Sequence, residues 1–325
     1  MLVSDFIKFK KSYSGCLFGI EIEVEGKRLP KEVEGFLVKE DGSLRGENQE
    51  YVFYKPSTKE ESVSHLNTLA NSFIANNSKL DYSFRTSTHV HMNVLDLECK
   101  HVLNLIYLYL LLEGCFINYS GKSRIGNRFC LRLCDAEGFI DSIHNGFMYD
   151  GQRIKDFNNE DLKYSSINLA AIINYGSLEF RSLSGTHEVG RILPWMCALE
   201  KLRDISQRYD SALEIYNTFV DNSLNIYSLL EEVFEENLHL FLYDDMLKDF
   251  LINASLSISI PFEIKFTNNV KAKIPDKVKP PKNNDNLQNI FDDVLGADMN
   301  IPNLDLNMQY IPQLIVNNVV QVEVA

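Results

Sequence analysis

The sequence is poor in cysteine, and the few thiols that it has lack the spacing of a disulfide or zinc framework. Its 325 residues contain six cysteines, at positions 16, 99, 115, 130, 134 and 197, and no two of them form a CxxC pair. Even Cys130 and Cys134 do not make a zinc knuckle. We therefore expect reduced and mostly buried thiols.

Positive charge is also scarce. Lys and Arg number 32 against 45 Asp and Glu, which gives a formal net charge of −13. Non-specific binding to a phosphate backbone needs an excess of cationic side chains, so we do not expect a nucleic-acid partner.

No long apolar run is present. The N-terminal segment MLVSDFIKFKK is interrupted by Asp5 and Lys8, unlike a secretory signal. The most apolar stretch, residues 101–117, contains Asn104 and Glu113 and falls short of the roughly 20 residues that cross a bilayer. These features predict a buried helix, no membrane partner and a cytoplasmic protein.

Proline is rare until residue 260, and six of the nine prolines lie beyond it. The segment KVKPPKNNDN is typical of a linker. We expect one main domain at residues 1–260, then a linker and an extended C-terminal tail at 261–325. A short helix near 287–296 would present one apolar face: Leu287, Ile290, Phe291, Val294 and Leu295. It could dock on its own domain, on a second subunit or on a partner protein.

Three segments alternate apolar and polar residues with the period of a β-strand. In GIEIEVE, apolar Ile20, Ile22 and Val24 would face a core while Glu21, Glu23 and Glu25 face the other way. The same alternation places His89 with His91, and Glu179 with Arg181. Further strands are expected at 50–54 and 86–94, and a strand pair at 165–173 and 177–183 around a turn at 174–176.

Helical patterns complete the expected fold. A helix after Pro56 would start with a capping box of Thr58 and Glu61. Its apolar stripe would comprise Val63, Leu66, Ala70, Phe73 and Ile74. Other helices are expected at about 98–119 and through 187–250. Strands before residue 184 and helices after it indicate the α+β class, with an antiparallel sheet.

Each polar pair alone is typical of a solvent-facing strand or a surface ion pair. Together, on one sheet, they would form a site in which oxygen ligands and one imidazole favour Mg²⁺, or Mn²⁺, over a zinc-thiolate centre. An arginine two residues from a ligand could then clamp a transferring phosphoryl group.

The motifs that carry these residues resemble those of a known family. In order, FGIEIEVEG, KEDGSL, the later Glu50, STHVHMNV, KYSSIN and SLEFRSLSGTHE are similar to the successive motifs of the amidoligases. That family belongs to the carboxylate-amine ligase group with the glutamine synthetase-like catalytic fold. The resemblance spans residues 17–188 and does not reach the last third of the chain.

The resemblance implies a curved antiparallel sheet with helices on its outer face, and an ATP- and Mg²⁺-dependent ligase that forms an amide through an acyl phosphate. One metal would be held by Glu21, His89 and Glu179, and another, nearer the substrate, by Glu23 and Glu50. His91 and Arg181 would contact phosphate oxygens. Nucleotide or substrate would also meet Lys163, Asn168, and Arg124 or Arg128. The amine could be that of an amino acid, a peptide or a polyamine.

Two questions stay open at this stage. The family places Ser-Pro soon after its second-strand glutamate, whereas YVFYKP follows Glu50 here, so either Glu47 or Glu50 could be the ligand. The same residues would also suit a metal-dependent hydrolase, or a non-catalytic binding or assembly module that retains the fold.

Overall fold

The computed structural model describes residues 1–7, 13–136, 143, 157, 164–220 and 226–242, and the fold below refers to these residues. The expected linker and tail helix at 261–325 lie outside them, as does the end of the helical region beyond residue 242.

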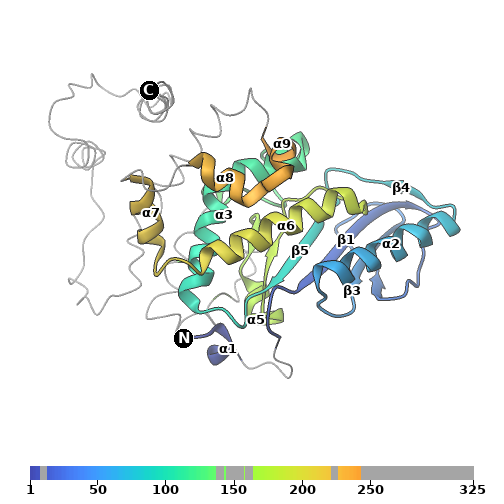
Figure 1. Ribbon diagram of the computed structural model, residues 1–325. Helices are drawn as coiled ribbons and strands as arrows, with labels where there is room; N and C mark the ends of the chain where they lie inside the picture. The colour runs from blue at the N-terminus through green and yellow to red at the C-terminus, as the bar shows by residue number, and fades with distance from the viewer. Residues whose placement is uncertain (8–12, 137–142, 144–156, 158–163, 221–225, 243–325) are drawn as a thin grey trace, which may run out of the picture. The chain divides into compact units, whose positions relative to one another are not determined.

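Seven strands form one antiparallel sheet in this part of the chain (Figure 1). The hydrogen-bonded order is β2-β3-β1-β5-β7-β6, and β4 pairs with β1 beside this path. The strands are β1 (Phe18–Lys27), β2 (Phe36–Lys39), β3 (Asn48–Phe53), β4 (Lys79–Asp81), β5 (Thr88–Asn93), β6 (Ile167–Asn168) and β7 (Ser177–Phe180). The sheet is not closed, and with the helices it confirms the α+β class and the antiparallel sheet.

Helices occupy the sequence between and after these strands. They are α1 (Val3–Phe6), α2 (Lys59–Ala75), α3 (Cys99–Ser120), α5 (Ala170–Tyr175), α6 (Val189–Ser206), α7 (Ala212–Val220), α8 (Ile226–Phe234) and α9 (Leu238–Phe241). Short 3-10 turns are η1 (Lys122–Arg124), η2 (Leu133–Asp135) and η5 (Glu235–Asn237). The predicted dominance of helices after residue 184 is confirmed in the described residues, although residues 207–211 separate α6 from α7.

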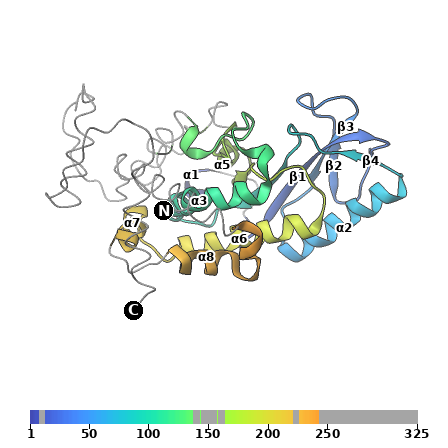
Figure 2. The same ribbon diagram turned by 90° about the horizontal axis from the view of Figure 1, so that it is seen from above.

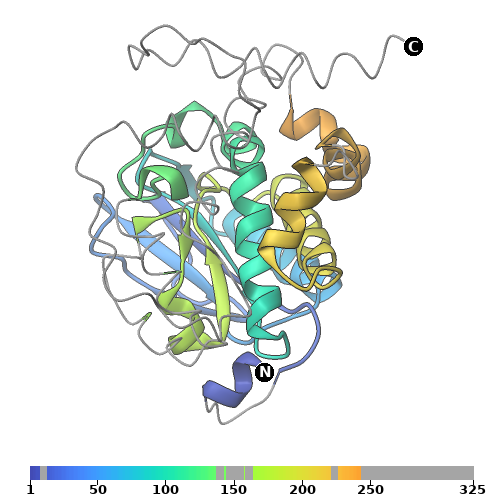
Figure 3. The same cartoon turned by 90° about the vertical axis from the view of Figure 1, so that its left-hand side faces the viewer.

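One face of the sheet is apolar and packs against helices. Ile20, Ile22 and Val24 of β1 are fully buried, as the alternation predicts. Figures 2 and 3 show α2, α3 and α6 on a single side of the sheet. Because successive side chains of a strand point to opposite faces, the glutamates of β1 must lie on the face that these helices leave free.

Behind the sheet, aromatic side chains join the helices. The Phe116 ring of α3 lies 4.8 Å from the Trp195 ring of α6, and it also contacts Phe234 and Phe241. Among the described residues, α3 is the one helix long and apolar enough to cross a membrane, yet 83% of its most apolar window is buried inside the protein. This confirms the expected buried helix.

Two local expectations were wrong. The predicted strand at 165–173 is only β6, and the chain then turns into α5, where the Asn168 side-chain oxygen accepts from the N–H of Ala170, the first residue of the helix, at 3.0 Å. In α2, Ile74 is 73% exposed and Leu69 is buried in its place. The buried row of Ser62, Leu66, Leu69 and Phe73 is narrower than the predicted stripe.

The predicted capping box is present, and it yields a stability test. The Thr58 hydroxyl accepts from the Glu61 N–H at 3.2 Å, and the Glu61 carboxylate accepts from the Thr58 N–H at 3.0 Å. Thr58→Ala should lower the free energy of unfolding by about 1 kcal/mol, because it leaves a helix donor unsatisfied. Urea unfolding of the two proteins measures the difference.

Thr68→Ala is the matched control. Thr68 lies within the same helix, and its hydroxyl donates back to the Ser64 carbonyl without capping any N–H group. Its loss should change stability by no more than a few tenths of a kcal/mol. Equal losses in the two variants would show that the cap contributes nothing of its own.

Candidate functional site

The strand register brings the predicted polar pairs onto one face. Residues directly opposite each other on antiparallel strands project from the same side of a sheet. Across the four central strands these partners are Glu21 with His89, Glu23 with Glu50, and His91 with Glu179.

The same register adds two polar residues from the outer strands. Lys39 lies opposite Glu50, and Asn168 lies opposite Glu179. All of these side chains therefore share the face that carries no core helix.

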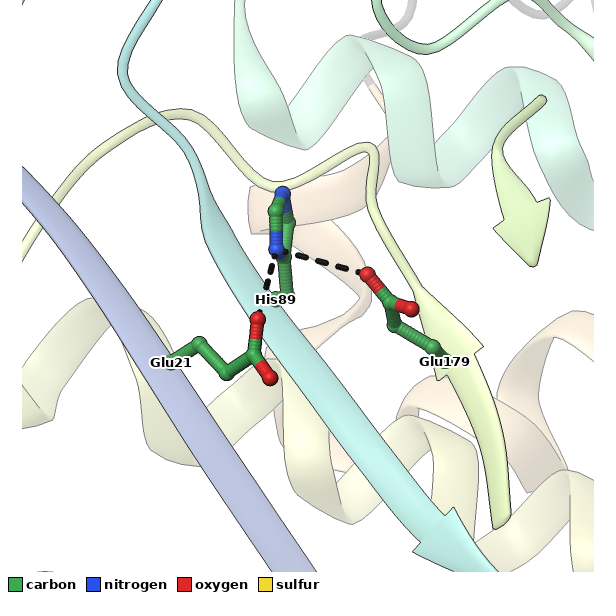
Figure 4. Close-up of side chains that lie close together, drawn as sticks. All are labelled: Glu21, His89 and Glu179. Carbon is green, nitrogen blue, oxygen red and sulfur yellow. Dashed lines mark hydrogen bonds and ion pairs between the residues drawn. The ribbon is translucent and has the colours of Figure 1, made fainter. Parts of the chain in front are cut away.

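Glu21, His89 and Glu179 form the first cluster, which takes one residue from each of β1, β5 and β7 (Figure 4). The His89 Nδ1 atom lies 3.2 Å from Glu21 Oε2 and 3.4 Å from Glu179 Oε1. An imidazole nitrogen carries at most one hydrogen, so it cannot donate fully to both carboxylates. A cation bound by all three atoms would satisfy them together.

The spacing of this cluster fits a small divalent cation. Oxygen and nitrogen ligands of an octahedral Mg²⁺ lie at 2.0–2.1 Å from the metal, which places neighbouring ligand atoms roughly 3 Å apart. The two Nδ1-to-oxygen distances are close to that value. Carboxylates are ligands that suit Mg²⁺ or Mn²⁺, and they outnumber the single imidazole here, which by itself suits transition metals.

A second cluster lies one step along β1. One ligand atom each from Glu23, Asp41 and Glu50 fall within 4.8 Å of one another. Sequence reasoning did not name Asp41 as a ligand, although its place in the KEDGSL motif was an available signal. Of the two alternatives at β3, the structure places Glu50 in this cluster and leaves the Glu47 side chain exposed.

The site face is largely buried, unlike a solvated strand face. Relative exposure is 6% for Glu23, 6% for Glu50, 4% for Glu179 and 3% for His89. Carboxylates removed from water need compensating charge, so burial of several together is costly for the protein alone. This argues against the reading of these pairs as ordinary solvent-facing residues.

The pKa values follow from this burial. Burial, with the charge of Glu21 added, raises the pKa of Glu50 to about 7, although Lys39 opposes the shift. Burial likewise raises the pKa of Glu23.

The pKa values of Glu21 and Glu179 are lowered instead. Burial favours the protonated form of each carboxyl, but nearby positive charge outweighs burial. The charge of His91 dominates that lowering at Glu21, and the charge of Arg181 at Glu179.

Three predicted residues hold the ligands in place. Arg181 donates to Glu179 Oε1, and Asn168 Nδ2 donates to Glu179 Oε2 at 2.6 Å. The His91 Nε2 atom lies 3.1 Å from Glu21 Oε1, and its Nδ1 atom lies 3.0 Å from the Ser177 hydroxyl. Arg181 retains a buried Nε that has no hydrogen-bond partner within the described residues.

The remaining predicted residues lie elsewhere. Arg124 is buried, and one of its terminal nitrogens donates at 2.8 Å to the Thr86 and Leu183 carbonyls and to the Ser87 hydroxyl. The Ser87 N–H in turn donates to Glu23 Oε2 at 2.7 Å. The structure therefore places Arg124 behind Glu23 as a support.

Of the last two predicted residues, Arg128 belongs to neither cluster. Arg128 is exposed, and its guanidinium lies 4.9 Å from the Phe129 ring centroid. Lys163 lies outside the described residues.

Comparisons with known proteins add little. No protein-family model matches the sequence, and no curated protein matches it. Among solved structures, a bifunctional glutathione synthetase from Pasteurella multocida is similar, with 9% sequence identity and a TM-score of 0.35, over 77% of this chain and 48% of the other. The chain thus spans about half the length of that protein. A likeness this low does not establish a common fold.

Glu50→Gln should stabilise the metal-free protein at pH 8. The pKa of Glu50 is about 7 in the folded chain, against an ordinary 4.5. The contribution of the Glu50 carboxyl to folding is therefore complete below its ordinary pKa of 4.5 and is lost as the pH rises through 7, where the buried group becomes charged. Above pH 7 the buried charge lowers the free energy of unfolding by about 1–3 kcal/mol after allowance for solvent screening, and the amide of Gln removes this loss. Urea unfolding in EDTA should show the gain at pH 8 and little change at pH 5.

Added Mg²⁺ should act in the opposite direction. It should raise the melting temperature of the unmodified chain by binding only the folded state, and this increment should shrink in Glu50→Gln. Glu47→Gln, which changes an exposed carboxylate three residues away, should leave both the stability and the increment unchanged. Equal Mg²⁺ increments in all three proteins would exclude Glu50 as a ligand.

Proposed function

We propose that this chain is an ATP- and Mg²⁺-dependent ligase that joins a carboxylate to an amine. The observation that carries the proposal is the pair of buried clusters, each with a ligand set for a hard divalent cation, on one face of an antiparallel sheet. The motif resemblance to the amidoligases supports the same chemistry. We further propose that the sheet is a catalytic sheet of the glutamine synthetase type.

Mg²⁺ ions bound to the clusters would align the triphosphate and neutralise its charge. Glu21, His89 and Glu179 would hold one ion, and Glu23, Asp41 and Glu50 would hold a second. With the reactants so aligned, positioning supplies much of the rate. The strands fix the ligands, and Arg124 and Asn168 fix two of the carboxylates from behind.

Arg181 would stabilise the transferring phosphoryl group. A substrate carboxylate oxygen attacks the γ-phosphorus, the bond to ADP breaks, and an acyl phosphate forms. The amine then attacks the acyl carbon, loses a proton and expels inorganic phosphate. Charge on the moving group spreads over its oxygens in the first step, which is where a guanidinium is most effective. His91, buried beside Glu21, would orient the Glu21 carboxylate and face the oxygens of the transferring phosphoryl group.

A product analysis tests the proposal directly. The full chain is incubated with Mg·ATP and a metabolite extract, and the products are followed by mass spectrometry. A condensation product that appears together with ADP supports a ligase. Cleavage products without ADP would instead indicate a metal-dependent hydrolase. Absence of any Mg·ATP-dependent thermal shift would favour a non-catalytic module, because a ligand of the folded state must raise its stability.

Arg181→Lys should lower the turnover number by roughly 100-fold while changing ATP affinity by less than about threefold, because a planar guanidinium clamp acts mainly in the transition state. Steady-state kinetics for ADP release, with ATP binding measured by calorimetry, separates the two effects.

Arg203→Lys is the matched control for this change. Arg203 is also buried and paired, with Asp96 at 2.8 Å, and belongs to neither cluster. Its turnover number should stay near that of the unmodified chain. A normal turnover number in Arg181→Lys would reject the assigned role.

Glu179→Gln should raise the Mg²⁺ concentration needed for half-maximal activity. The amide removes one charge from the first cluster and keeps the side-chain size, so metal affinity should fall by about tenfold or more. Activity titrated against free Mg²⁺ at saturating ATP measures the shift. An unchanged Mg²⁺ curve would remove Glu179 from the ligand set.

A further inference from the structure

Three arginines and two phenylalanines stack alternately beyond the second cluster. The guanidiniums of Arg45 and Arg85 lie 5.3 and 5.8 Å from the Phe84 ring centroid. Arg85 also lies 5.5 Å from the Phe129 ring, and Arg128 lies 4.9 Å from it. These five residues, the arginine–phenylalanine cluster, come from three separate segments of the chain, and sequence reasoning assigned a role only to Arg128.

The cluster has cationic capacity that the protein does not use. Within the described residues, no carboxylate forms an ion pair with Arg45, Arg85 or Arg128, although the chain carries a net charge of −13. Arg45 and Arg128 are exposed, and Phe84 is 48% exposed. Among the residues that the structure describes, the buried Nε of Arg85 has no hydrogen-bond partner. Stacked guanidiniums keep their N–H edges free for a planar anion.

One loop joins the arginine–phenylalanine cluster to the carboxylate cluster of Glu23, Asp41 and Glu50. The Ser43 N–H donates to Asp41 Oδ1 at 2.7 Å, and the Ser43 carbonyl accepts from Arg85 at 2.8 Å. The Arg45 N–H donates at 2.8 Å to Glu25 Oε1. Since Glu25 follows Glu21 and Glu23 along the site face of β1, the arginines lie on the Glu23 side of the metal-binding residues.

The other end of the site face has a different character. Leu37 is 55% exposed and pairs through Val52 with Glu21 in the register. Tyr175 is 63% exposed, and its ring stands edge-on to that of His91 with centroids 5.6 Å apart. Exposed apolar and aromatic side chains suit a flat uncharged group such as a nucleobase. The arginines of the cluster are therefore not required to bind a nucleobase.

We propose that the arginine–phenylalanine cluster recognises the carboxylate substrate, and that this substrate is a polycarboxylate bearing at least one negative charge besides its reacting carboxylate. As a substrate site it rests on the proposed function. The reacting carboxylate lies at the metals, and a second carboxylate on the same molecule meets the unpaired guanidiniums. The phenylalanines give the intervening carbon chain an apolar surface.

Calorimetric titrations of the full chain at fixed free Mg²⁺ test this selectivity. The probes are butyrate, glutarate and tricarballylate, which carry one, two and three carboxylates, and Mg·ADP is titrated in parallel. Affinity should rise from butyrate to tricarballylate. Arg45→Gln and Arg128→Gln, both at exposed positions, should each weaken tricarballylate binding by about tenfold and leave Mg·ADP binding within about twofold.

Two further variants sharpen the test. Arg208→Gln removes an exposed charge outside the site and should change neither affinity. Tyr175→Ser should weaken Mg·ADP binding severalfold and leave tricarballylate binding unchanged.

Each adverse result has a separate meaning. Failure of the unmodified chain to prefer tricarballylate over butyrate, or equal affinity in the arginine variants, would overturn the inference. Weakened Mg·ADP binding in those variants would assign the cluster to the nucleotide and overturn it too. If tricarballylate binds and depends on the arginines while Mg·ADP does not bind the unmodified chain, the proposed ligase function fails and the polycarboxylate site stands.

Discussion

The concentration of carboxylates on one largely buried sheet face is the constraint to which the rest of the structure responds. Glu21 and Glu23 come from β1, Glu50 from the adjacent β3 and Glu179 from β7, which lies beyond β5, and Asp41 joins them from a loop. Such a group is stable only when cations or hydrogen-bond donors replace the lost water. Arg181 and Lys39 each compensate one carboxylate, and burial, with the charge of Glu21 added, still raises the pKa of Glu50. The face is therefore built to receive positive charge.

The supporting residues make sense as devices that aim these carboxylates. Arg124 is too deeply buried to meet a ligand easily, yet it fixes Ser87, whose N–H holds Glu23. Asn168 makes two hydrogen bonds. Its amide nitrogen donates to the Glu179 carboxylate, and its oxygen accepts from the first N–H of α5. Helices packed on the opposite face keep the strands rigid. A site held this firmly keeps its donors aligned at no cost during the reaction.

Much of this face was predictable because its determinants are local. The alternation of apolar and acidic residues from Ile20 to Glu25 determines which side chains share a face. The capping box of Thr58 and Glu61 predicts where a helix begins. Register was not predictable, because no local pattern states which residue of β5 lies opposite Glu21. Asp41 was missed for the same reason, since a turn residue meets Glu23 only through the tertiary fold.

The error at 165–173 has a different origin. The run INLAAII has too few residues to separate a strand from a helix by periodicity. Two local features favour the helix there: the Asn168 oxygen accepts from the Ala170 N–H, and Gly176 ends α5 with a positive φ of 72°. A side chain on Gly176 would also meet Leu95, so glycine is required by space as well as by backbone conformation.

The residues proposed for metal binding and those proposed for substrate recognition lie on different kinds of structural element. Glu21 and Glu23 lie on a central strand whose register is fixed on both sides, so their positions cannot change without disturbing the sheet. Arg45 and Arg128 instead lie in loops, beyond the strand ends. Loops accept substitution more readily than central strands do. If the two proposed roles hold, a chain organised in this way can change the acid that it recognises while its metal-binding face is kept, because the loop from Asp41 to Arg45 joins the two sets of residues without being part of the central strands.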